Sequence, residues 1–338
     1  MIKKEFIPRN YVEVKEGDIA FADASEDTND VAKAIEFLST DEIPTICGLH
    51  TIHGRDKLKL TELGYKGYYF SSDAFHNQVK KRAQGTKIFS VSPKLLSECR
   101  ISIPSKLEQK KIASLLLTID ERIATQSKII EKLQSLMDGL KNKLLSQHFL
   151  DEKIKLSELG ILKNGYAFKS SSYVPLGKYN VVTISNVSGD RFVTGNFNHL
   201  ATLPTDIQPH QILFKKEILI SLTGNVGRVS LNHGENNLLN QRVGLFHIPQ
   251  RELHEFIYQC LSSPSFEASM RQKAQGAAQM NIGKNDIEEY EIPFSSDFEL
   301  IKKVSSLLYS LDQRLIVAKD LNEIFLVQKL YLLKHMFI

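Results

Sequence analysis

The alternation of apolar and polar residues predicts a long helical stretch in the middle of the chain. From Leu107 to about Gln147 there is no proline, and Gly139 is the sole glycine. Asp120 is expected to divide this stretch into a short helix and a long one. In the long helix, residues three and four apart form a heptad seam: Ile123, Gln126, Ile130, Leu133, Met137, Leu140 and Leu144. Such a seam needs a partner helix, and a helix from Glu121 to Gln147 would be about 40 Å long.

The C-terminal stretch from about Glu299 repeats the seam, which makes it the expected partner helix. The equivalent positions are Leu315, Ala318, Phe325, Leu332 and Met336. Asn322 and Lys329 occupy the heptad positions equivalent to those of Ile130 and Met137 in the first copy. Polar residues at such positions fix the register of a coiled coil at some cost in stability. The two helices are therefore expected to pack as an antiparallel coiled coil.

Shorter elements are predicted outside the two long helices. Gly17-Asp18 is expected to form a turn before the apolar run that begins at Ile19. Two short helices are expected to start at serine caps, over Ser71–Arg82 and Ser263–Lys273. Strands are predicted over 98–104 and, in the second half, within NVVTISNV, EILISL and KNDIEEYEIP.

The same pattern occurs twice, about 190 residues apart, because residues 71–123 and 262–315 run in parallel. KIASLLLTIDERI at 111–123 corresponds to KVSSLLYSLDQRL at 303–315. Two copies predict two similar modules related by pseudo-symmetry. The expected fold is α/β (α+β): globules at 1–104 and 151–296, and helical regions at 105–150 and 297–338. About 50 residues, from Lys155 to about Pro204, have no counterpart in the first copy, so we expect the first globule to be shortened at its amino-terminal side.

Composition favours a cytoplasmic protein that binds a polyanion. Three scattered cysteines argue for reduced thiols. No run of about 18 apolar residues exists, so no membrane span is expected, and the apolar end at 324–338 is interpreted as a buried helix. Net charge is only +4, but residues 51–150 hold 18 Lys and Arg against 9 Asp and Glu. A basic middle suits a polyanionic partner.

No catalytic constellation is found, so we expect a protein that is not an enzyme. The chain lacks an Asn/Asp-Pro-Pro-Tyr/Phe sequence and a phosphate-binding loop. His50 and His53 lie near Cys47, but a structural zinc site usually needs four ligands. Neither a metal nor a cofactor is therefore expected in this chain.

DNA binding has better support, because donor side chains gather on predicted loops. Arg, Lys, Asn and Gln match base edges, and Lys, Arg and Ser/Thr hold phosphates. The first globule offers Lys80, Lys81, Arg82, Gln84, Thr86 and Lys87. The second offers Thr223, Gly224, Asn225, Arg228, Asn240, Gln241, Arg242, Gln275, Gln279, Asn281 and Lys284.

The paired Ile-Pro elements resemble those of the specificity (S) subunit of type I restriction–modification systems. They are IPSKLEQKKIASLLLTIDERI at 103–123 and IPFSSDFELIKKVSSLLYSLDQRL at 292–315. LKNKLLSQ at 140–147, SLTGNVGRVS at 221–230, NQRVGLFHI at 240–248 and AQGAAQMNIGKNDIEEYEIP at 274–293 are also similar to family segments. The second element departs from the family, with Glu299-Leu300 in place of Glu108-Gln109.

The resemblance implies that both globules are target-recognition domains, each reading half of a split double-stranded DNA sequence. It implies helical regions that act as a ruler and dock two methyltransferase (M) subunits, which restriction (R) subunits join. S-adenosylmethionine, ATP and Mg would then belong to those partners. A silent or recombined specificity cassette and a helical scaffold without DNA contact stay open. So do three explanations of the short first globule: a misplaced start, a truncated or recombined gene, and a natural minimal domain.

Overall fold

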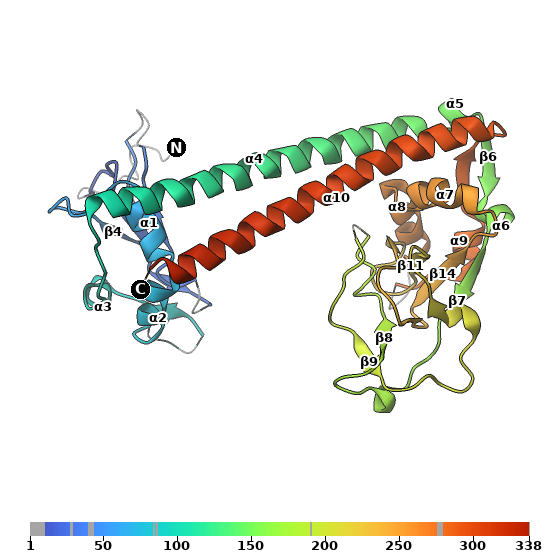
Figure 1. Cartoon of the computed structure of the whole chain (residues 1–338), viewed down its shortest axis with the longest axis horizontal. Helices are drawn as coiled ribbons and strands as arrows, with labels where there is room; N and C mark the ends of the chain where they lie inside the picture. Colours follow the sequence, from blue (N-terminus) through green and yellow to red (C-terminus); the bar gives the residue numbers. More distant parts are fainter. Residues whose placement is uncertain are drawn as a thin grey trace. The chain divides into compact units, whose positions relative to one another are not determined.

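The computed structural model describes residues 11–27, 30–39, 44–83, 85, 87–189, 191–275 and 280–337 (Figure 1). The chain forms two compact units. The first unit contains Met1–Ile130 and Val317–Ile338, and the second contains Glu131–Ile316. Both long helices contribute to both units: α4 (Lys106–Leu144) and α10 (Phe298–His335).

The first unit is built on a small antiparallel sheet. Its strand order is β3 (Ala34–Glu36), β1 (Ile19–Ala22), β4 (Thr51–Gly54). The predicted turn before β1 is confirmed, because Gly17 has φ +80°. The other elements are α1 (Tyr65–Phe70), α2 (Asp73–Lys80), α3 (Pro93–Ser97) and the pair β2 (Ala24–Ser25) and β5 (Phe89–Ser90).

Aromatic side chains dominate the core of the first unit. Phe75 of α2 is buried and lies edge-on to Phe70, with ring centroids 4.7 Å apart. The predicted serine cap is confirmed, since Ser72 Oγ accepts the Phe75 N–H at 3.4 Å. Both long helices close this core: Leu116 of α4 is fully buried, and Phe337, just beyond α10, packs on Tyr69 at 5.6 Å.

The second unit contains three sheets. Their strand orders are β12-β11-β14-β7, β10-β13-β8-β9 and β15-β6, and within them only β13 and β8 run parallel. The strands are β6 (Glu152–Lys155), β7 (Ile161–Asn164), β8 (Tyr179–Val182), β9 (Asn198–Leu200), β10 (Ile212–Leu213), β11 (Ile218–Ser221), β12 (Val229–Leu231), β13 (Asn237–Leu239), β14 (Val243–His247) and β15 (Glu291–Phe294). The predicted strands are thus confirmed in β8, β11 and β15, although KNDIEEYEIP begins as a helix.

Short helices complete the second unit. They are α5 (Gln147–Leu150), α6 (Leu156–Leu159), α7 (His254–Leu261), α8 (Pro264–Lys273) and α9 (Lys284–Glu288), with single 3-10 turns at Ser170–Ser172, Pro209–Gln211 and Arg251–Leu253. Ser263 caps α8 as Ser72 caps α2, which confirms the repeat. Leu308 of α10 is fully buried in this core, and Met137 of α4 is 3% exposed.

The two long helices pack together as the predicted coiled coil. Met137, Leu315 and Ala318 are buried on it, and the other seam positions are half-buried: Ile123, Ile130, Leu133, Leu140, Leu144, Phe325, Leu332 and Met336. Gln126 is also buried, and its Nε2 donates to the Ala318 carbonyl at 3.0 Å. A buried amide that finds a partner in one alignment only favours that register.

The expected helix break at Asp120 is wrong, because α4 is continuous from Lys106 to Leu144. Aspartate disfavours a helix partly by bonding to the nearby backbone. Here its carboxylate accepts the Tyr68 hydroxyl at 2.8 Å and Lys329 Nζ at 2.5 Å. Since both partners lie outside α4, the side chain no longer competes with the helix.

The expected strand over 98–104 is also wrong. The segment pairs with no described strand, whereas its counterpart β15 pairs with β6. Side chains hold it instead: Gln78 exchanges two hydrogen bonds with the Arg100 backbone, at 2.9 and 2.8 Å. The Tyr69 hydroxyl accepts the Ser102 N–H at 3.0 Å.

An ion cluster fixes the start of β1. Asp18 is 2% exposed and receives two bonds from the Arg55 guanidinium, at 2.8 and 2.6 Å. His53 Nε2 and the Lys15 N–H lie 2.8 Å from the same carboxylate. The Arg55 hydrogen bonds, followed by His53 and Lys15, hold the pKa of Asp18 well below its ordinary range, although burial opposes this.

We expect Asp18→Asn to lower the free energy of unfolding of the first unit by about 3 kcal/mol at neutral pH, because it leaves buried partners uncompensated. A depressed pKa stabilises the fold fully above the ordinary value of about 3.9 and progressively less as pH falls below it. Denaturation measured between pH 7 and pH 3 should therefore show that the difference in free energy of unfolding between wild type and variant becomes smaller as pH falls. A difference that stays constant over this pH range would contradict this assignment. Glu16→Gln, an exposed carboxylate on the turn before β1, is the control.

Candidate nucleic-acid interface

Three loops of the second unit converge around Leu222. The Leu222 N–H donates to the Arg242 carbonyl at 2.9 Å, and the Leu222 carbonyl accepts the Ile282 N–H at 2.9 Å. Thr223 forms a β-bridge with Asn281. The fold thus brings together candidates far apart in the sequence: Thr223 and Gly224 from one loop, Arg242 from the second and Asn281 from the third. We call this group the loop cluster.

The loop between β11 and β12 is shaped by its glycines. Gly224 and Gly227 have φ +71° and +77°, which favours glycine. A side chain at Gly227 would also approach Met270 Cβ to 2.6 Å. Within the loop, Ser221 Oγ accepts the Arg228 N–H at 3.0 Å and donates to the Asn225 carbonyl. The Asn225 side chain is exposed on this loop, whose backbone Ser221 binds at two points.

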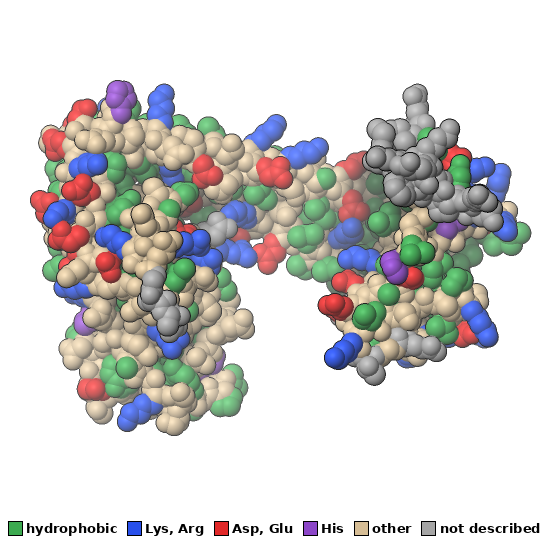
Figure 2. All heavy atoms as spheres, turned by 180° about the vertical axis from the view of Figure 1, so that it is seen from behind, with side chains coloured by type: hydrophobic (Ala, Val, Ile, Leu, Met, Phe, Trp, Pro, Cys, Tyr) green, Lys and Arg blue, Asp and Glu red, His purple; other side chains and the backbone are tan. Residues whose placement is uncertain are grey.

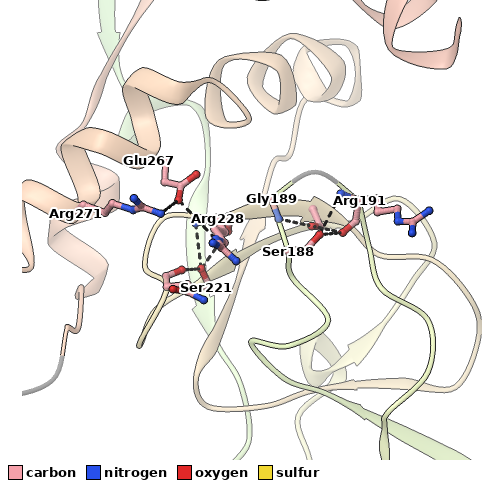
Figure 3. A network of polar contacts seen from close by, with 9 residues as sticks. Ser188, Gly189, Arg191, Ser221, Arg228, Glu267 and Arg271 are labelled. Atoms are coloured by element: carbon pink, nitrogen blue, oxygen red, sulfur yellow. Dashed lines mark hydrogen bonds and ion pairs between the residues drawn. The ribbon is translucent and has the colours of Figure 1, made fainter. Parts of the chain in front are cut away.

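Arg228 belongs to a charge network at the edge of the loop cluster (Figure 3). Glu267 Oε1 lies 3.6 Å from Arg228 Nε and 2.5 Å from an Arg271 amino group. One carboxylate thus offsets part of the charge of two arginines and fixes their direction. Arg228 also lies over Gly189, where a Cβ would come within 3.4 Å of the Arg228 Cγ.

The sequence reasoning missed the loop that carries Ser188 and Arg191. Ser188 Oγ donates to the Arg191 carbonyl at 2.5 Å, and Ser230 Oγ donates to the same carbonyl at 3.2 Å. The backbone of this loop thus lies against Ser230 and Arg228, while the exposed Arg191 side chain points away from Arg228 in Figure 3. Ser188-Gly189 is the one local signal in the sequence, and it predicts a turn. It does not show that this turn lies next to the loop between β11 and β12.

The remaining candidates of the second unit fall into two groups. Asn240 is buried, and its Oδ1 accepts the Arg242 N–H at 3.1 Å, so it shapes the loop. The side chains at the surface are Gln241, Arg242, Gln275, Asn281 and Lys284. Lys284 pairs with Glu288 at 3.6 Å. Gln279 lies outside the described residues.

In the first unit the candidates lie at the end of α2. Lys80, Lys81 and Lys87 are exposed. Arg82 instead donates to the Gln78 carbonyl at 2.9 Å and to the Glu98 carbonyl at 3.5 Å, so it holds the end of the helix. Gln84 and Thr86 lie outside the described residues.

The histidines near Cys47 serve the fold. His53 binds Asp18, and His50 lies 3.5 Å from Asp23. Within the described ranges, no group of three His, Cys, Asp or Glu side chains is placed to hold a metal ion. No helix in that part of the chain is long and apolar enough to cross a bilayer.

Charge on the second unit is mixed. Figure 2 shows Lys and Arg side chains interspersed with Asp and Glu. Such a surface gives weak non-specific attraction to phosphates, since that attraction depends on the number of cations aligned with the backbone. Recognition by this unit would therefore rest on individual polar contacts.

A family model and the curated relatives that match this chain have descriptions of the same kind. A family model described as "Type I restriction modification DNA specificity domain" matches residues 9–135 and 151–324. The type I restriction enzyme MjaVIII specificity subunit of Methanocaldococcus jannaschii is 23% identical over 278 residues, 75% of this chain. The putative MjaX specificity subunit of the same organism is 24% identical over 285 residues, 80% of this chain. The chain spans 65% of the length of each of these curated relatives.

Solved structures share the fold. The S subunit of a type I restriction–modification system from M. genitalium has a TM-score of 0.67 at 20% identity, covering 100% of this chain and 92% of that one. A chain from a study of type I complex assembly and conformational transition has a TM-score of 0.57 at 14% identity, covering 97% and 84%.

Proposed function

Since the chain belongs to the family of type I restriction–modification DNA specificity domains, we propose that it is a non-catalytic subunit that recognises a bipartite double-stranded DNA target. The observation that carries this proposal is the repeat. Two units with equivalent capped helices are each closed by the same two long helices. Two similar readers joined by one helical region suit a target made of two separated half-sites.

The loop cluster is the proposed reading surface of the second unit. Arg242 and Asn281 are exposed there, and forked donors of this kind discriminate base edges in the major groove. Arg228 and Arg191 flank the cluster and suit phosphates. In the first unit the exposed lysines 80, 81 and 87 would contact the backbone of the other half-site.

The long helices are the proposed ruler between half-sites. α4 has 39 residues, which corresponds to about 58 Å of helix. Residues up to Ile130 belong to the first unit and those from Glu131 to the second. The number of helical residues between the two cores would therefore set the non-specific spacer.

A strongly apolar exposed face on α10 supports docking of a methyltransferase subunit. Val317, Ile324, Val327, Leu330 and Tyr331 are each 60% exposed or more. Large exposed apolar patches mark interaction sites. We propose that each of two M subunits packs helices on this helical region, and that R subunits join them. S-adenosylmethionine, ATP and Mg would be bound by these partners, where the chemistry takes place.

Loss of base contacts should weaken specific DNA binding by the M–S complex. We expect Arg242→Ala or Asn281→Ala to reduce affinity for the cognate duplex about 10-fold to 100-fold, the range for one bidentate base contact. Affinity for unrelated DNA should change little. Arg251→Ala, an exposed arginine on another turn of the unit, is the control. Fluorescence anisotropy at several salt concentrations measures the affinity for the cognate duplex and for unrelated DNA. An equal loss of affinity for both would contradict base readout.

A heptad inserted after Ile130, with a matching heptad after Ile316, should lengthen the spacer and keep both half-sites. Seven residues add about 10 Å of helix, or about three base pairs. Methylome sequencing of a host that carries the variant and its M subunit measures the motif. Inserting four residues at the same places breaks the seam and should abolish methylation. A methylated motif with its spacer unchanged after the heptad insertion would rule out the ruler.

The docking face can be tested by adding charge. We expect Ile324→Asp with Val327→Asp to abolish co-purification with the M subunit while the circular dichroism spectrum stays native. Gln328→Asp adds a charge to the same helix without removing apolar surface and should retain the complex. Retention of the M subunit by the double variant would show that docking occurs elsewhere.

A further inference from the structure

Glu267 lies between two arginines at the edge of the loop cluster (Figure 3). Its Oε1 lies 3.6 Å from Arg228 Nε and 2.5 Å from an Arg271 amino group. The side chain of Glu267 is 30% exposed, and those of Arg228 and Arg271 are 32% and 49% exposed. All three charges are therefore within reach of a ligand that binds at this surface.

Packed backbone holds this group of charges on both sides. Glu267 belongs to the first turn of α8, which Ser263 caps and where the helix dipole favours a carboxylate. On the other side, Ser221 Oγ accepts the Arg228 N–H at 3.0 Å. The two elements are in contact, because a Cβ at Gly227 would come within 3.3 Å of the Glu267 Cα. The carboxylate is thus placed beside Arg228 by the fold.

The first unit contains the counterpart of this helix. The repeat aligns α2 with α8, and both helices begin at a capping serine. Arg82 and Lys273 are equivalent in this alignment, and each donates to a backbone carbonyl beyond its helix. The acceptors are Glu98, at 3.5 Å, and Asp286, at 2.7 Å. The alignment therefore holds in the structure as well as in the sequence.

His76 stands in the first unit where the second has Glu267. Burial, and then the charge of Lys80, lower the pKa of His76, so this side chain is neutral at neutral pH. Lys80, the counterpart of Arg271, is exposed, and so is Lys81. At equivalent places, the first copy thus presents cations next to a neutral residue, and the second presents cations next to a carboxylate.

A carboxylate at a DNA-facing surface has two separate effects. It repels phosphates, and this repulsion lowers the affinity for DNA of every sequence. It also fixes the direction of Arg228, which reduces the conformational freedom that the arginine loses on binding. A fixed direction helps only when the loop cluster is in register with its bases. The two effects together raise the ratio of cognate to unrelated affinity, which is the quantity that matters in a genome.

We propose that Glu267 is a specificity-determining residue of the second unit, which lowers the affinity for DNA of any sequence and positions Arg228 on the cognate target. The sequence-independent attraction then comes mainly from Lys80 and Lys81 of the first unit. This role rests on the proposed function, because it requires the loop cluster to face double-stranded DNA. Glu267 acts through the two arginines and needs no contact with a base.

Two duplexes and the M–S complex test the proposal. One duplex carries the motif found by methylome sequencing, and the other has a scrambled sequence. We expect Glu267→Gln to raise the affinity for the scrambled duplex about threefold to tenfold at low salt. The slope of log affinity against log salt should steepen by about 0.9 for each phosphate contact that is gained. The affinity for the cognate duplex should rise less, because Arg228 loses its direction. Fluorescence anisotropy measures both affinities.

Three further variants separate charge from direction. Glu267→Asp keeps the charge but is too short to contact both arginines. It should leave the affinity for the scrambled duplex unchanged and lower the cognate affinity about threefold, the scale of one exposed ion pair. Glu267→Gln combined with Arg271→Gln restores the net charge and should return the affinity for the scrambled duplex to the wild-type value. Glu252→Gln, which removes an exposed carboxylate elsewhere on the unit, is the control.

The contribution of the first unit has its own variant. We expect Lys80→Gln with Lys81→Gln to weaken binding of both duplexes by a similar factor. The slope of log affinity against log salt should become flatter by about 0.9 for each phosphate contact that is lost. A loss confined to the cognate duplex would show that these lysines read sequence, which would contradict the proposed division between the units.

The outcomes distinguish this role from the proposed function. Equal binding of the two duplexes by the wild-type complex would refute sequence recognition itself. If the wild type discriminates but Glu267→Gln leaves the affinity for the scrambled duplex unchanged, or lowers both affinities, the role of Glu267 alone is overturned. An equal rise with Glu252→Gln would also overturn it, because net charge rather than the position of the carboxylate would then control binding.

Discussion

The architecture depends on the packing of α4 against α10, because neither unit has a complete core without both helices. Leu116 and Phe337 close the first unit, and Leu308 and Met137 close the second. The seam between the two helices also contains polar contacts at two positions. The Gln126 amide reaches the Ala318 carbonyl, and Asp120 binds Lys329. Buried and half-buried polar pairs of this kind add little net stability, but they penalise every other register. Loops carried by these cores are thus attached to an element of fixed alignment, which is the requirement for reading a split target.

The sequence predicted what periodicity and capping determine. The seam and the serine caps at Ser72 and Ser263 follow from residues close together in the chain, and the duplication follows from segments that resemble each other along the sequence. The two wrong predictions, the helix break at Asp120 and the strand at 98–104, concern features that depend on residues far apart in the chain. Continuity of α4 through Asp120 depends on Tyr68 and Lys329. The backbone of 98–104 is held by the side chains of Gln78 and Tyr69 and not by a described strand. Likewise, the backbone of the Arg191 loop lies against Arg228 only because loops from distant strands meet. Such contacts are tertiary, and a single sequence carries no local trace of them.

Within the candidate site, the fold separates side chains that build loops from those that face outward. The side chains of Asn240 and Arg82 form hydrogen bonds with backbone groups, whereas those of Arg242 and Asn281 are exposed on their loops. Glu267 restrains two arginines and lowers the local positive charge. This combination suits directional contacts better than bulk attraction to phosphate.

The most direct test of the account is the methylome of a methylation-free host that expresses this chain with the methyltransferase subunit of its system. Two readers joined by a helical ruler predict one split motif, with two defined halves, a fixed spacer and methyladenine in both halves. A continuous motif, or stable complexes that leave the host DNA unmethylated, would contradict the claim that the repeat reads a bipartite target.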